Sequence, residues 1–442
     1  METVFIHGVG SELQGVGRLA DGRAVFVTGA IPGERVSVEV TRDAGRFCEA
    51  TLTSVLEPSP DRIEPVCPHA GVCGGCTARH MRYERTLALK EQVVREQLAR
   101  IGSVADPEVR PILGCDDPDR ARNKAEYPIG RVNGRIDIGA FRRNSREILP
   151  LSDCLLQRPE SAAALRWFSK NLDRIEGASR LKYLVTRVNR QGELMLILSG
   201  EGPLTQAIRG LAPALREALP ALKSFFYCQL KPRPAHALDG RCARISGDGT
   251  LEDTLLGLRF ELAPQAFFQV NPPQAERLYA LALEAAGIRE GCDLKILDAY
   301  CGAGTITLAA ARHARDALGV EIVAPAIENA KRNAVLNGMQ ARARFVCADA
   351  AKEIPRLLRR GERFDAVILD PPRKGADEAL LNAVAEARIP TVSYVSCNPA
   401  TLARDMKRLT ALGYRFHYAY PVDLFPWTEH VETVVLMSRV KD

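Results

Sequence analysis

The sequence predicts a multidomain α/β protein with a small N-terminal β-barrel, a central α+β domain and a C-terminal doubly wound α/β domain. Its 442 residues exceed the size of one typical hydrophobic core. Short apolar runs separated by glycine turns begin the chain, whereas strands and helices alternate from about residue 263. We place the three domains at residues 1–60, 61–265 and 266–442.

Composition narrows the possible functions. The formal charge of +6 is mildly basic, which permits a nucleic-acid partner without requiring one. No stretch approaches the roughly 20 apolar residues of a membrane span, and the first residues lack the features of a signal peptide. We therefore expect a cytoplasmic protein with no membrane partner. In such a protein the 12 cysteines indicate reduced thiols, metal ligation or catalysis rather than disulfides.

The N-terminal segment has the pattern of an OB-like β-barrel. Asp21-Gly22 and Asp43-Ala44-Gly45 are turn signals, and residues 24–27 and 36–40 have the length and apolar character of strands. About five short strands at this spacing are typical of barrels that bind oligonucleotides. A barrel without a ligand fits the same pattern equally well.

A cysteine array follows the proline-rich linker that ends near residue 65. Its spacing is C-x5-C-x2-C, formed by Cys67, Cys73 and Cys76. Thiolates this close repel one another unless a cation neutralises them, and a fourth ligand is needed. We predict Cys154 for that role, in preference to Cys48 and Cys115. Four thiolates can hold structural zinc or an iron–sulfur cluster, and a metal-free loop is the alternative.

The central region carries basic residues among aromatic ones. Residues 77–100 have a helical period with a basic face, and residues 120–127 and 141–143 interleave arginine or lysine with tyrosine or phenylalanine. Such stretches can bind phosphates and stack on bases. An ordinary sheet with one solvated side would look the same.

The C-terminal third predicts a Rossmann-like domain that binds S-adenosylmethionine. The strand at residues 296–299 enters a glycine turn, Gly302-Ala303-Gly304-Thr305, which lacks the G-x-G-x-x-G pattern of pyrophosphate sites. Glu321, about 20 positions after the first strand's end, is placed to bind ribose hydroxyls, and Asp349 to face the adenine amine. Two further acidic residues belong to the predicted strands: Asp298 lies on the first strand, and Asp370 ends the fourth.

Cys397 lies where a predicted strand ends, just before Asn398-Pro399. Most lone cysteines are small buried apolar residues. This one shares the strand-end position with the acidic residues above, and α/β proteins place their chemistry at that edge. The pattern therefore predicts a reactive cysteine in a pocket.

Five ordered motifs over nearly the whole chain resemble the RNA uracil-C5 methyltransferase family. They are LAPQAFFQVN (262–271), LDAYCGAGT (297–305), DPPRKG (370–375), SYVSCNPAT (393–401) and DLFPWTEHVE (423–432). The barrel is similar to the TRAM domain of the ribosomal-RNA branch of that family. The cysteine array is similar to the [4Fe-4S] site of the same branch.

The resemblance implies transfer of a methyl group from S-adenosylmethionine to a uridine of RNA. Cys397 would add to uracil C6, and Glu432 would remove the C5 proton, with His430 as the alternative base. The remaining cofactor residues implied by the motifs are Gln269, Tyr300, Thr305 and Asp370. Thr305 departs from an asparagine often found there in the 23S branch. We expect a monomer acting on 23S rRNA, with tRNA as the alternative substrate.

Other functions compete with this interpretation. An RNA cytosine-C5 methyltransferase would have a further cysteine after the proline of the Asp370-Pro371-Pro372 motif, and this sequence has none there. An amino-group methyltransferase would have an aromatic residue at the position of Arg373. A non-catalytic RNA-binding factor would not need Cys397 and Glu432. Phe267 and Phe268 either stack on a flipped base or belong to the core.

Overall fold

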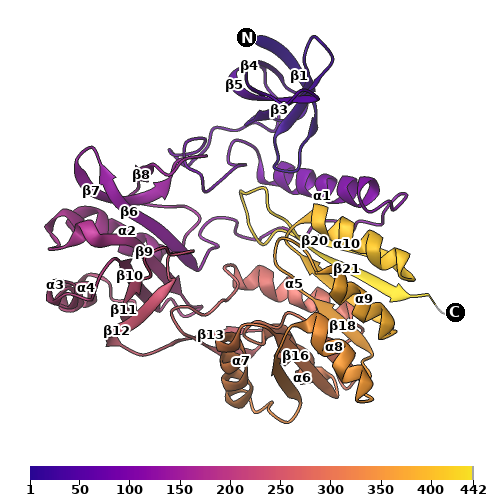
Figure 1. The fold of residues 1–442 in the computed structure, drawn as a ribbon. Coiled ribbons are helices and arrows are strands. Elements are labelled where there is room, and N and C mark those ends of the chain that lie inside the picture. Colours follow the sequence, from indigo (N-terminus) through magenta and orange to yellow (C-terminus); the bar gives the residue numbers. More distant parts are fainter. Residues whose placement is uncertain (441–442) are drawn as a thin grey trace.

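The computed structural model describes residues 1–440, so the last two residues of the predicted third domain, 441 and 442, lie outside the described residues. Figure 1 shows the N-terminal barrel at the top, above helix α1 (Tyr83–Arg100), with a central domain to the left and a C-terminal domain to the right. None of the helices within residues 1–440 is long and apolar enough to cross a bilayer.

The barrel has five strands in the order β1-β2-β3-β5-β4. They are β1 (Glu2–Val9), β2 (Gly15–Arg18), β3 (Ala24–Thr28), β4 (Arg35–Asp43) and β5 (Phe47–Glu57). Alternate residues such as Val4, Ile6 and Val36 point inward and are buried, as the period of two requires. The predicted N-terminal barrel is confirmed.

The barrel is fastened to the rest of the chain by a buried carboxylate. Glu34 is fully buried, and its Oε1 accepts a hydrogen bond from Arg62 Nε at 2.5 Å. Below this ion pair, the apolar side chains of Leu13 and Ile31 pack on Leu89 of α1. The barrel therefore rests on α1 through an apolar contact.

The central domain is built on a seven-stranded sheet in the order β12-β11-β10-β9-β6-β7-β8. Its strands are β6 (Lys124–Val132), β7 (Arg135–Phe141), β8 (Ile148–Pro150), β9 (Leu181–Val188), β10 (Leu194–Gly200), β11 (Leu222–Leu230) and β12 (Gly240–Gly247). Helices α2 (Pro159–Asn171), α3 (Gln206–Arg209) and α4 (Leu211–Ala218) accompany it. Apolar residues of α2 and α4, including Phe168 and Leu215, pack on the sheet. This is the α+β middle domain that the sequence predicted.

The C-terminal sheet is doubly wound, with strand order β17-β16-β15-β18-β19-β21-β20. Its strands are β15 (Lys295–Asp298), β16 (Asp316–Glu321), β17 (Ala343–Cys347), β18 (Ala366–Leu369), β19 (Thr391–Ser396), β20 (Tyr414–Val422) and β21 (Glu432–Arg439). The first five are parallel to one another, whereas β21 runs antiparallel to β19 and β20. The order reverses between β15 and β18, where a ligand crevice forms at the carboxyl ends of the strands.

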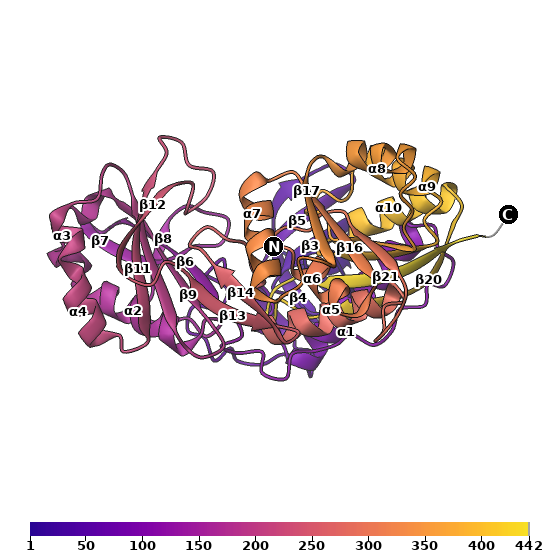
Figure 2. The ribbon, with the colours of Figure 1, turned by 90° about the horizontal axis from the view of Figure 1, so that it is seen from below.

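Helices cover both faces of this sheet, as Figure 2 shows. They are α5 (Pro272–Ala285), α6 (Thr305–His313), α7 (Ala324–Leu336), α8 (Ala350–Arg359), α9 (Glu378–Glu386) and α10 (Pro399–Ala411). Residues of α8, α9 and α10 share one apolar core, and residues of α5, α6 and α7 share the other. The Rossmann-like architecture is thus the one predicted.

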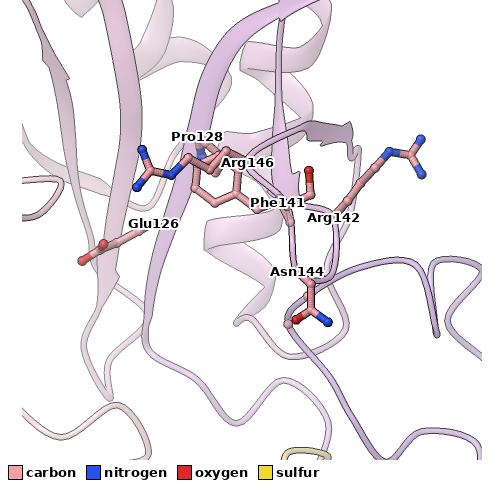
Figure 3. Close-up of a pocket in the computed structure, with 10 residues that line it drawn as sticks. Glu126, Pro128, Phe141, Arg142, Asn144 and Arg146 are labelled. Atoms are coloured by element: carbon pink, nitrogen blue, oxygen red, sulfur yellow. The ribbon is translucent and has the colours of Figure 1, made fainter. Parts of the chain in front are cut away.

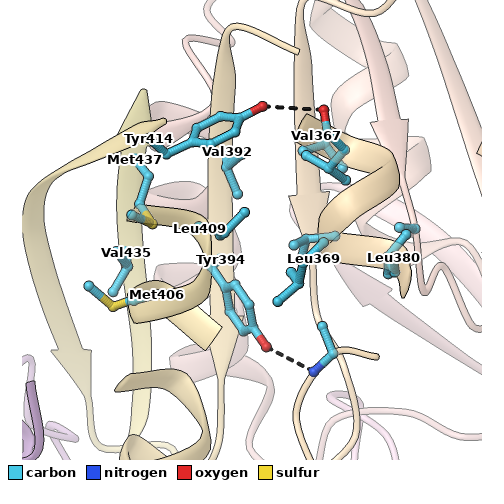
Figure 4. Packing of buried hydrophobic residues seen from close by; sticks show 14 of the residues in the cluster. Val367, Leu369, Leu380, Val392, Tyr394, Met406, Leu409, Tyr414, Val435 and Met437 are labelled. Carbon is cyan, nitrogen blue, oxygen red and sulfur yellow. Dashed lines mark hydrogen bonds between the residues drawn. The ribbon is translucent and has the colours of Figure 1, made fainter. Parts of the chain in front are cut away.

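Two buried tyrosines join the first of these cores to polar backbone and side-chain groups. Tyr394 Oη donates to Asp405 Oδ2 at 2.6 Å and accepts from the Ala376 amide at 3.1 Å. Tyr414 Oη donates to the Ile389 carbonyl at 2.7 Å. Figure 4 shows both rings among Val392, Met406 and the other apolar side chains of this core. Their hydroxyls avoid the cost of an unpaired buried donor.

Two segments that precede residue 266 pack with the C-terminal sheet. Val94 and Leu98 of α1 belong to the same apolar core as residues of α10 and β20. The hairpin of β13 (Leu251–Leu255) and β14 (Leu258–Leu262) shares the other core with α5 and α6. The C-terminal domain is therefore completed by parts of the chain on both sides of the central sheet.

Candidate active site

The predicted acidic residues and Cys397 gather at one edge of the C-terminal sheet. Because β15 to β19 are parallel, their carboxyl ends meet there. The residues at or just beyond those ends are Asp298, Glu321, Asp349, Asp370 and Cys397. Glu432 begins antiparallel strand β21 and so reaches the same edge. The sheet thus brings both predicted catalytic residues to the predicted cofactor edge.

The glycine turn after β15 is shaped for a close approach. Gly304 has φ +84°, and a Cβ there would lie 2.9 Å from the Phe345 ring. Gly302 has φ +51° with open space beside it. Glu321 holds the turn, because its Oε2 accepts from the Gly302 amide at 3.3 Å and its Oε1 from the Val323 amide at 2.9 Å. A nucleoside can therefore approach the backbone beside a fixed carboxylate.

Asp298 offers an unused acceptor in this region. Its side chain is fully buried, and Oδ2 accepts from Thr307 Oγ1 at 2.7 Å while Oδ1 has no partner within residues 1–440. Burial raises the pKa of Asp298 to about 6. An unpaired buried oxygen is costly, so this atom is suited to accept from a bound cationic or N–H group.

Gln269 and Thr305 meet at one buried tyrosine. Gln269 Nε2 donates to Tyr279 Oη at 3.0 Å, and the Thr305 side chain interacts with the same hydroxyl. Burial raises the pKa of Tyr279, and the adjacent Asp370 charge raises it further. The two predicted cofactor residues therefore lie beside Asp370. Tyr279 was missed because an apolar helical face gives no sign of a buried hydroxyl.

The other two predicted cofactor residues are Asp349, at the start of α8, and Tyr300, in the turn after β15. Asp349 is the N-cap of α8, where Oδ1 accepts from the Ala351 amide at 3.0 Å. Tyr300 is half-buried, and burial raises its pKa to about 12. Asp349 thus has a structural role that leaves its Oδ2 paired only with surface Lys352, at 3.6 Å.

Cys397 and Glu432 lie in one neighbourhood. The antiparallel ladder between β19 and β21 ends with the pair of Ser396 and Thr433, and Cys397 and Glu432 are the residues next to that last pair in the chain. Burial raises the pKa of the Cys397 thiol to about 11, with the Glu432 charge as the next cause.

Cys397, Glu432 and Asp370 are close enough that a negative charge on one disfavours a charge on the others. Glu432 is only 5% exposed, and burial followed by the Asp370 charge raises its pKa to about 8. Burial, followed by the Asp298 charge, raises the pKa of Asp370 to about 7. Such shifts make Glu432 able to hold or release a proton near neutral pH.

Arg373 supplies the nearby positive charge, which lowers the pKa of both Cys397 and Glu432. Its Nη2 lies 3.0 Å from His430 Nε2. The Arg373 carbonyl accepts from Thr401 Oγ1 at 3.3 Å, which fastens its loop to the turn after Cys397. Burial lowers the pKa of His430, so the ring is neutral beside the guanidinium.

The segment that leads to Glu432, residues 423–431, is anchored by α1. Lys90 Nζ lies 2.6 Å from Asp423 Oδ1, and both side chains are fully buried. Tyr83 Oη donates to Asp423 Oδ2 at 2.6 Å, and Lys90 also donates to the Phe425 carbonyl at 3.1 Å. A buried pair with this many partners fixes the segment in place.

The four predicted cysteine ligands share one neighbourhood. Burial raises the pKa of Cys154, and the charges of Cys73 and Cys67 raise it further. Burial likewise raises the pKa of Cys76 to about 11, with Cys154 among the lesser causes. Within residues 1–440, no three His, Cys, Asp or Glu side chains stand in the arrangement that holds a single metal ion.

The two rejected candidates lie elsewhere. Cys48 is buried in the barrel core. The Cys115 thiol accepts from Asn271 Nδ2 at 3.7 Å. Neither is among the charges that act on Cys154 or Cys76.

Residues 77–79, directly after the cysteine array, contact the segment before Glu432. The amides of Thr77 and Ala78 donate to the Trp427 carbonyl at 2.9 and 3.1 Å. Thr77 Oγ1 donates to Glu429 Oε2 at 3.0 Å, and Arg79 stacks 4.9 Å from the Trp427 ring centre. Sequence reasoning missed this contact, because residues about 350 positions apart carry no joint signal.

The two phenylalanines of the FFQVN motif have different roles. Phe268 is 3% exposed and packs against Phe260 with ring centres 5.8 Å apart. Phe267 is 71% exposed. Stacking of Phe268 on a base is therefore wrong, and Phe267 alone remains available.

Comparison with known proteins shows the family of this chain. Residues 251–440 match the family described as tRNA (uracil-5-)-methyltransferase, and residues 2–53 match the TRAM domain. An uncharacterized RNA methyltransferase of Caldanaerobacter subterraneus is 38% identical, over 99% of this chain and 98% of that protein. Another from Halalkalibacterium halodurans is 37% identical, over 95% and 93%.

A solved structure has the same architecture. It is the Pyrococcus abyssi tRNA (uracil-54, C5)-methyltransferase in complex with S-adenosyl-L-homocysteine, 25% identical, with a TM-score of 0.75 and coverage of 99% of this chain and 100% of that chain. Sequence identity over the full length and the shared fold lead to the same conclusion. The chain belongs to the RNA (uracil-5-)-methyltransferase family and is an S-adenosylmethionine-dependent RNA methyltransferase.

Proposed function

We propose that this enzyme methylates C5 of a uridine in 23S rRNA through a covalent adduct to Cys397. The observation that carries the chemistry is the proximity of Cys397 and Glu432, which adjoin the last pair of β19 and β21 at the cofactor edge. The TRAM barrel and the cysteine array favour rRNA. The Pyrococcus abyssi protein, whose title gives a tRNA uracil as its substrate, makes tRNA the second candidate.

The residues at the sheet edge fit S-adenosylmethionine, which supplies an electrophilic methyl group. The unpaired Asp298 Oδ1 can accept from the amino group of the methionine part. Glu321 can accept from the ribose hydroxyls while Gly302 and Gly304 leave room for the nucleoside. Gln269, Thr305 and Tyr300 close this edge, with Asp370 beside them and Asp349 at its far side.

Cys397 and Glu432 divide the chemistry at the uracil ring. Uracil C5 is a weak nucleophile, so the Cys397 thiolate first adds to C6 and turns the ring into an enolate that attacks the methyl group. Glu432 then removes the C5 proton, which allows the thiolate to leave. The Arg373 charge favours both the thiolate and the carboxylate, against the cost of burial.

Glu432 is preferred to His430 as the base. The Glu432 charge acts on Cys397, whereas the His430 ring is engaged with the Arg373 guanidinium at 3.0 Å. Phe267, exposed next to the Gln269 motif, is placed to stack on the flipped uracil.

We further propose that Cys67, Cys73, Cys76 and Cys154 hold a [4Fe-4S] cluster with a structural role. The mutual influence of their thiols supports this, since four thiolates in one neighbourhood need a compensating cation. A four-iron cluster spreads its ligands more widely than a single ion does. Iron and sulfide analysis of anaerobically purified protein tests it, with C154S as the variant expected to lose iron and C347S, at an exposed cysteine of the C-terminal domain, as the control.

One labelling experiment tests the main proposal. The enzyme is incubated with methyl-labelled S-adenosylmethionine and total RNA from cells that lack its gene, and the RNAs are separated before nucleoside analysis. Label in 5-methyluridine of 23S RNA supports the proposal in full. Label in tRNA keeps the mechanism and overturns the substrate, whereas label in cytidine, or full activity of C397A, overturns the role of Cys397.

A further inference from the structure

We propose that a cavity beside the cysteine array binds a second, unpaired nucleotide of the RNA, outside the methylation site. The cavity has a volume of about 570 Å³ and lies between Gly74-Gly75 of the array and the connection from β7 to β8. This inference rests on the proposed function, because it concerns the same RNA substrate. Figure 3 shows the residues that line the cavity.

The wall of the cavity suits a nucleobase. Phe141, at the end of β7, is 37% exposed, and Pro128 and Ala140 also line the cavity. The Phe141 ring is therefore accessible from the cavity. Stacking of a base on such a ring is favourable and tolerates any base, because every base has a π-face.

The rim of the cavity suits the phosphates on either side of one nucleotide. Arg142 and Arg146 extend in opposite directions from the β7–β8 connection (Figure 3). Arg146 has no ion pair within residues 1–440, and Arg142 meets only Glu147, at 3.7 Å. The carboxylate of the cavity, Glu126, is neutralised by Lys124 at 2.7 Å. The rim therefore carries net positive charge available to RNA.

The cavity is held open by the cysteine array itself. The Gly74 amide donates to the Phe141 carbonyl at 2.9 Å, and the Arg143 amide donates to the Val72 carbonyl at 2.9 Å. Arg143 Nη2 also donates to the Cys76 carbonyl at 2.6 Å. The backbone of residues 141–143, which carries Phe141 and Arg142, is thus fixed before RNA arrives, and this reduces the entropy lost on binding.

The same array segment contacts the active-site segment on its other side. Thr77, one residue after Cys76, donates to Glu429, three residues before Glu432. A single strand that crosses the array can therefore reach both the cavity and Cys397. The structure thus assigns the cavity to a nucleotide near the target uridine rather than to a separate ligand.

Fluorescence anisotropy with labelled substrate RNA at several salt concentrations tests the proposal. F141L is expected to weaken binding at least about fivefold, because stacking is lost, and F141W to retain it. For R142Q/R146Q, the plot of the logarithm of the association constant against the logarithm of the salt concentration should be less steep by about 1 to 2, since each arginine displaces one counterion. In methylation assays the weaker binding of F141L and R142Q/R146Q should appear as a higher KM for RNA. R216Q, an exposed arginine of α4 without an ion pair within residues 1–440, is the control and should match the wild type.

The outcomes separate this proposal from the proposed function. If the wild-type enzyme methylates RNA but F141L and R142Q/R146Q bind as it does, the nucleotide site is refuted and the activity stands. If F141W is as weak as F141L, stacking is refuted. If R216Q weakens binding as much as R142Q/R146Q, the effect is general charge and the cavity has no special role. An enzyme that labels no RNA refutes the proposed function itself.

Discussion

Cys397 and Glu432 flank the last pair of the antiparallel ladder between β19 and β21, that of Ser396 and Thr433, and the charge of Glu432 acts on the Cys397 thiol. Within this doubly wound sheet, β21 is the only strand of residues 1–440 that runs against the other strands. A purely parallel sheet would place the start of the next strand at the far edge, away from Cys397. The reversed strand is what brings a carboxyl group to the thiol.

Replacement of Glu432 should trap the covalent adduct. In E432Q the thiolate can still add to C6 and the methyl group can still transfer, but proton removal lacks its base. We expect turnover to fall by about 100-fold or more. Denaturing electrophoresis with labelled RNA should show a cross-linked band that C397A lacks. If H430Q traps the adduct and E432Q does not, His430 is the base.

Activity should rise with pH between about 6 and 8. Glu432 must be ionised to remove a proton, and burial raises its pKa to about 8. Below that value, kcat/KM should fall at least about tenfold for each pH unit, because the Cys397 thiol, whose pKa burial raises to about 11, must lose its proton as well. Initial rates over this range, normalised to folded protein, measure the effect. A flat profile would show that Glu432 is ionised throughout and is not limiting.

E432Q should be more stable than the wild type in alkaline solution. The folded protein holds the Glu432 proton up to a pKa of about 8, against an ordinary value of 4.5. Between those values the native state binds more protons than the unfolded state, so wild-type stability declines as pH rises. E432Q escapes this decline and should gain on the order of 2 kcal/mol at pH 9 but little at pH 5. Denaturant unfolding at both pH values provides the comparison.

The pair of Lys90 and Asp423 should show strong coupling. Both side chains are fully buried, so K90M leaves an unpaired carboxylate and D423N leaves an unpaired ammonium. Each single variant should lose about 3–5 kcal/mol of unfolding free energy. The double variant K90M/D423N should lose less than the sum of the two. Additive losses in this double-mutant cycle would mean that the ion pair contributes no coupling energy.

Two glycines of the turn after β15 should respond differently to alanine. G304A places a methyl group 2.9 Å from the Phe345 ring, whereas G302A meets nothing within 4 Å. Both residues have positive φ, so each variant carries backbone strain of about 1 kcal/mol. We expect G304A alone to show a further stability loss. G302A should chiefly weaken S-adenosylhomocysteine binding, measured by calorimetry, because its methyl group enters the space beside Glu321.

The parts that the sequence could predict are those with local or ordered signals. The turn signals and alternating strands of the barrel, and the strand–turn–helix repeats after residue 263, predicted their architecture correctly. The strand-end position also gathered Asp298, Glu321, Asp370 and Cys397 at one edge. The carboxyl ends of parallel strands meet at one edge of the sheet, so the topology alone brings these residues together.

The parts that it could not predict depend on long-range packing. Residues 77–100 look like a helix with a basic, solvated face, yet Lys90 is fully buried against Asp423. Phe267 and Phe268 are chemically identical neighbours, and only packing against Phe260 separates the exposed ring from the buried one. Periodicity of a single segment carries no information about such partners.

The ion pair of Lys90 and Asp423 also sets when α1 and the segment that contains Asp423 can pack together during synthesis. The two residues are 333 positions apart, so at 5–20 residues per second α1 waits roughly 20 to 70 s on the ribosome before its partner appears. During that time Lys90 and the apolar residues Val94 and Leu98 lack their partners, although Leu89 can already pack on the barrel. The segment that carries Glu432 can be anchored to α1 only after Asp423 has been made. A nascent chain therefore becomes competent for catalysis only when α1 and this segment meet.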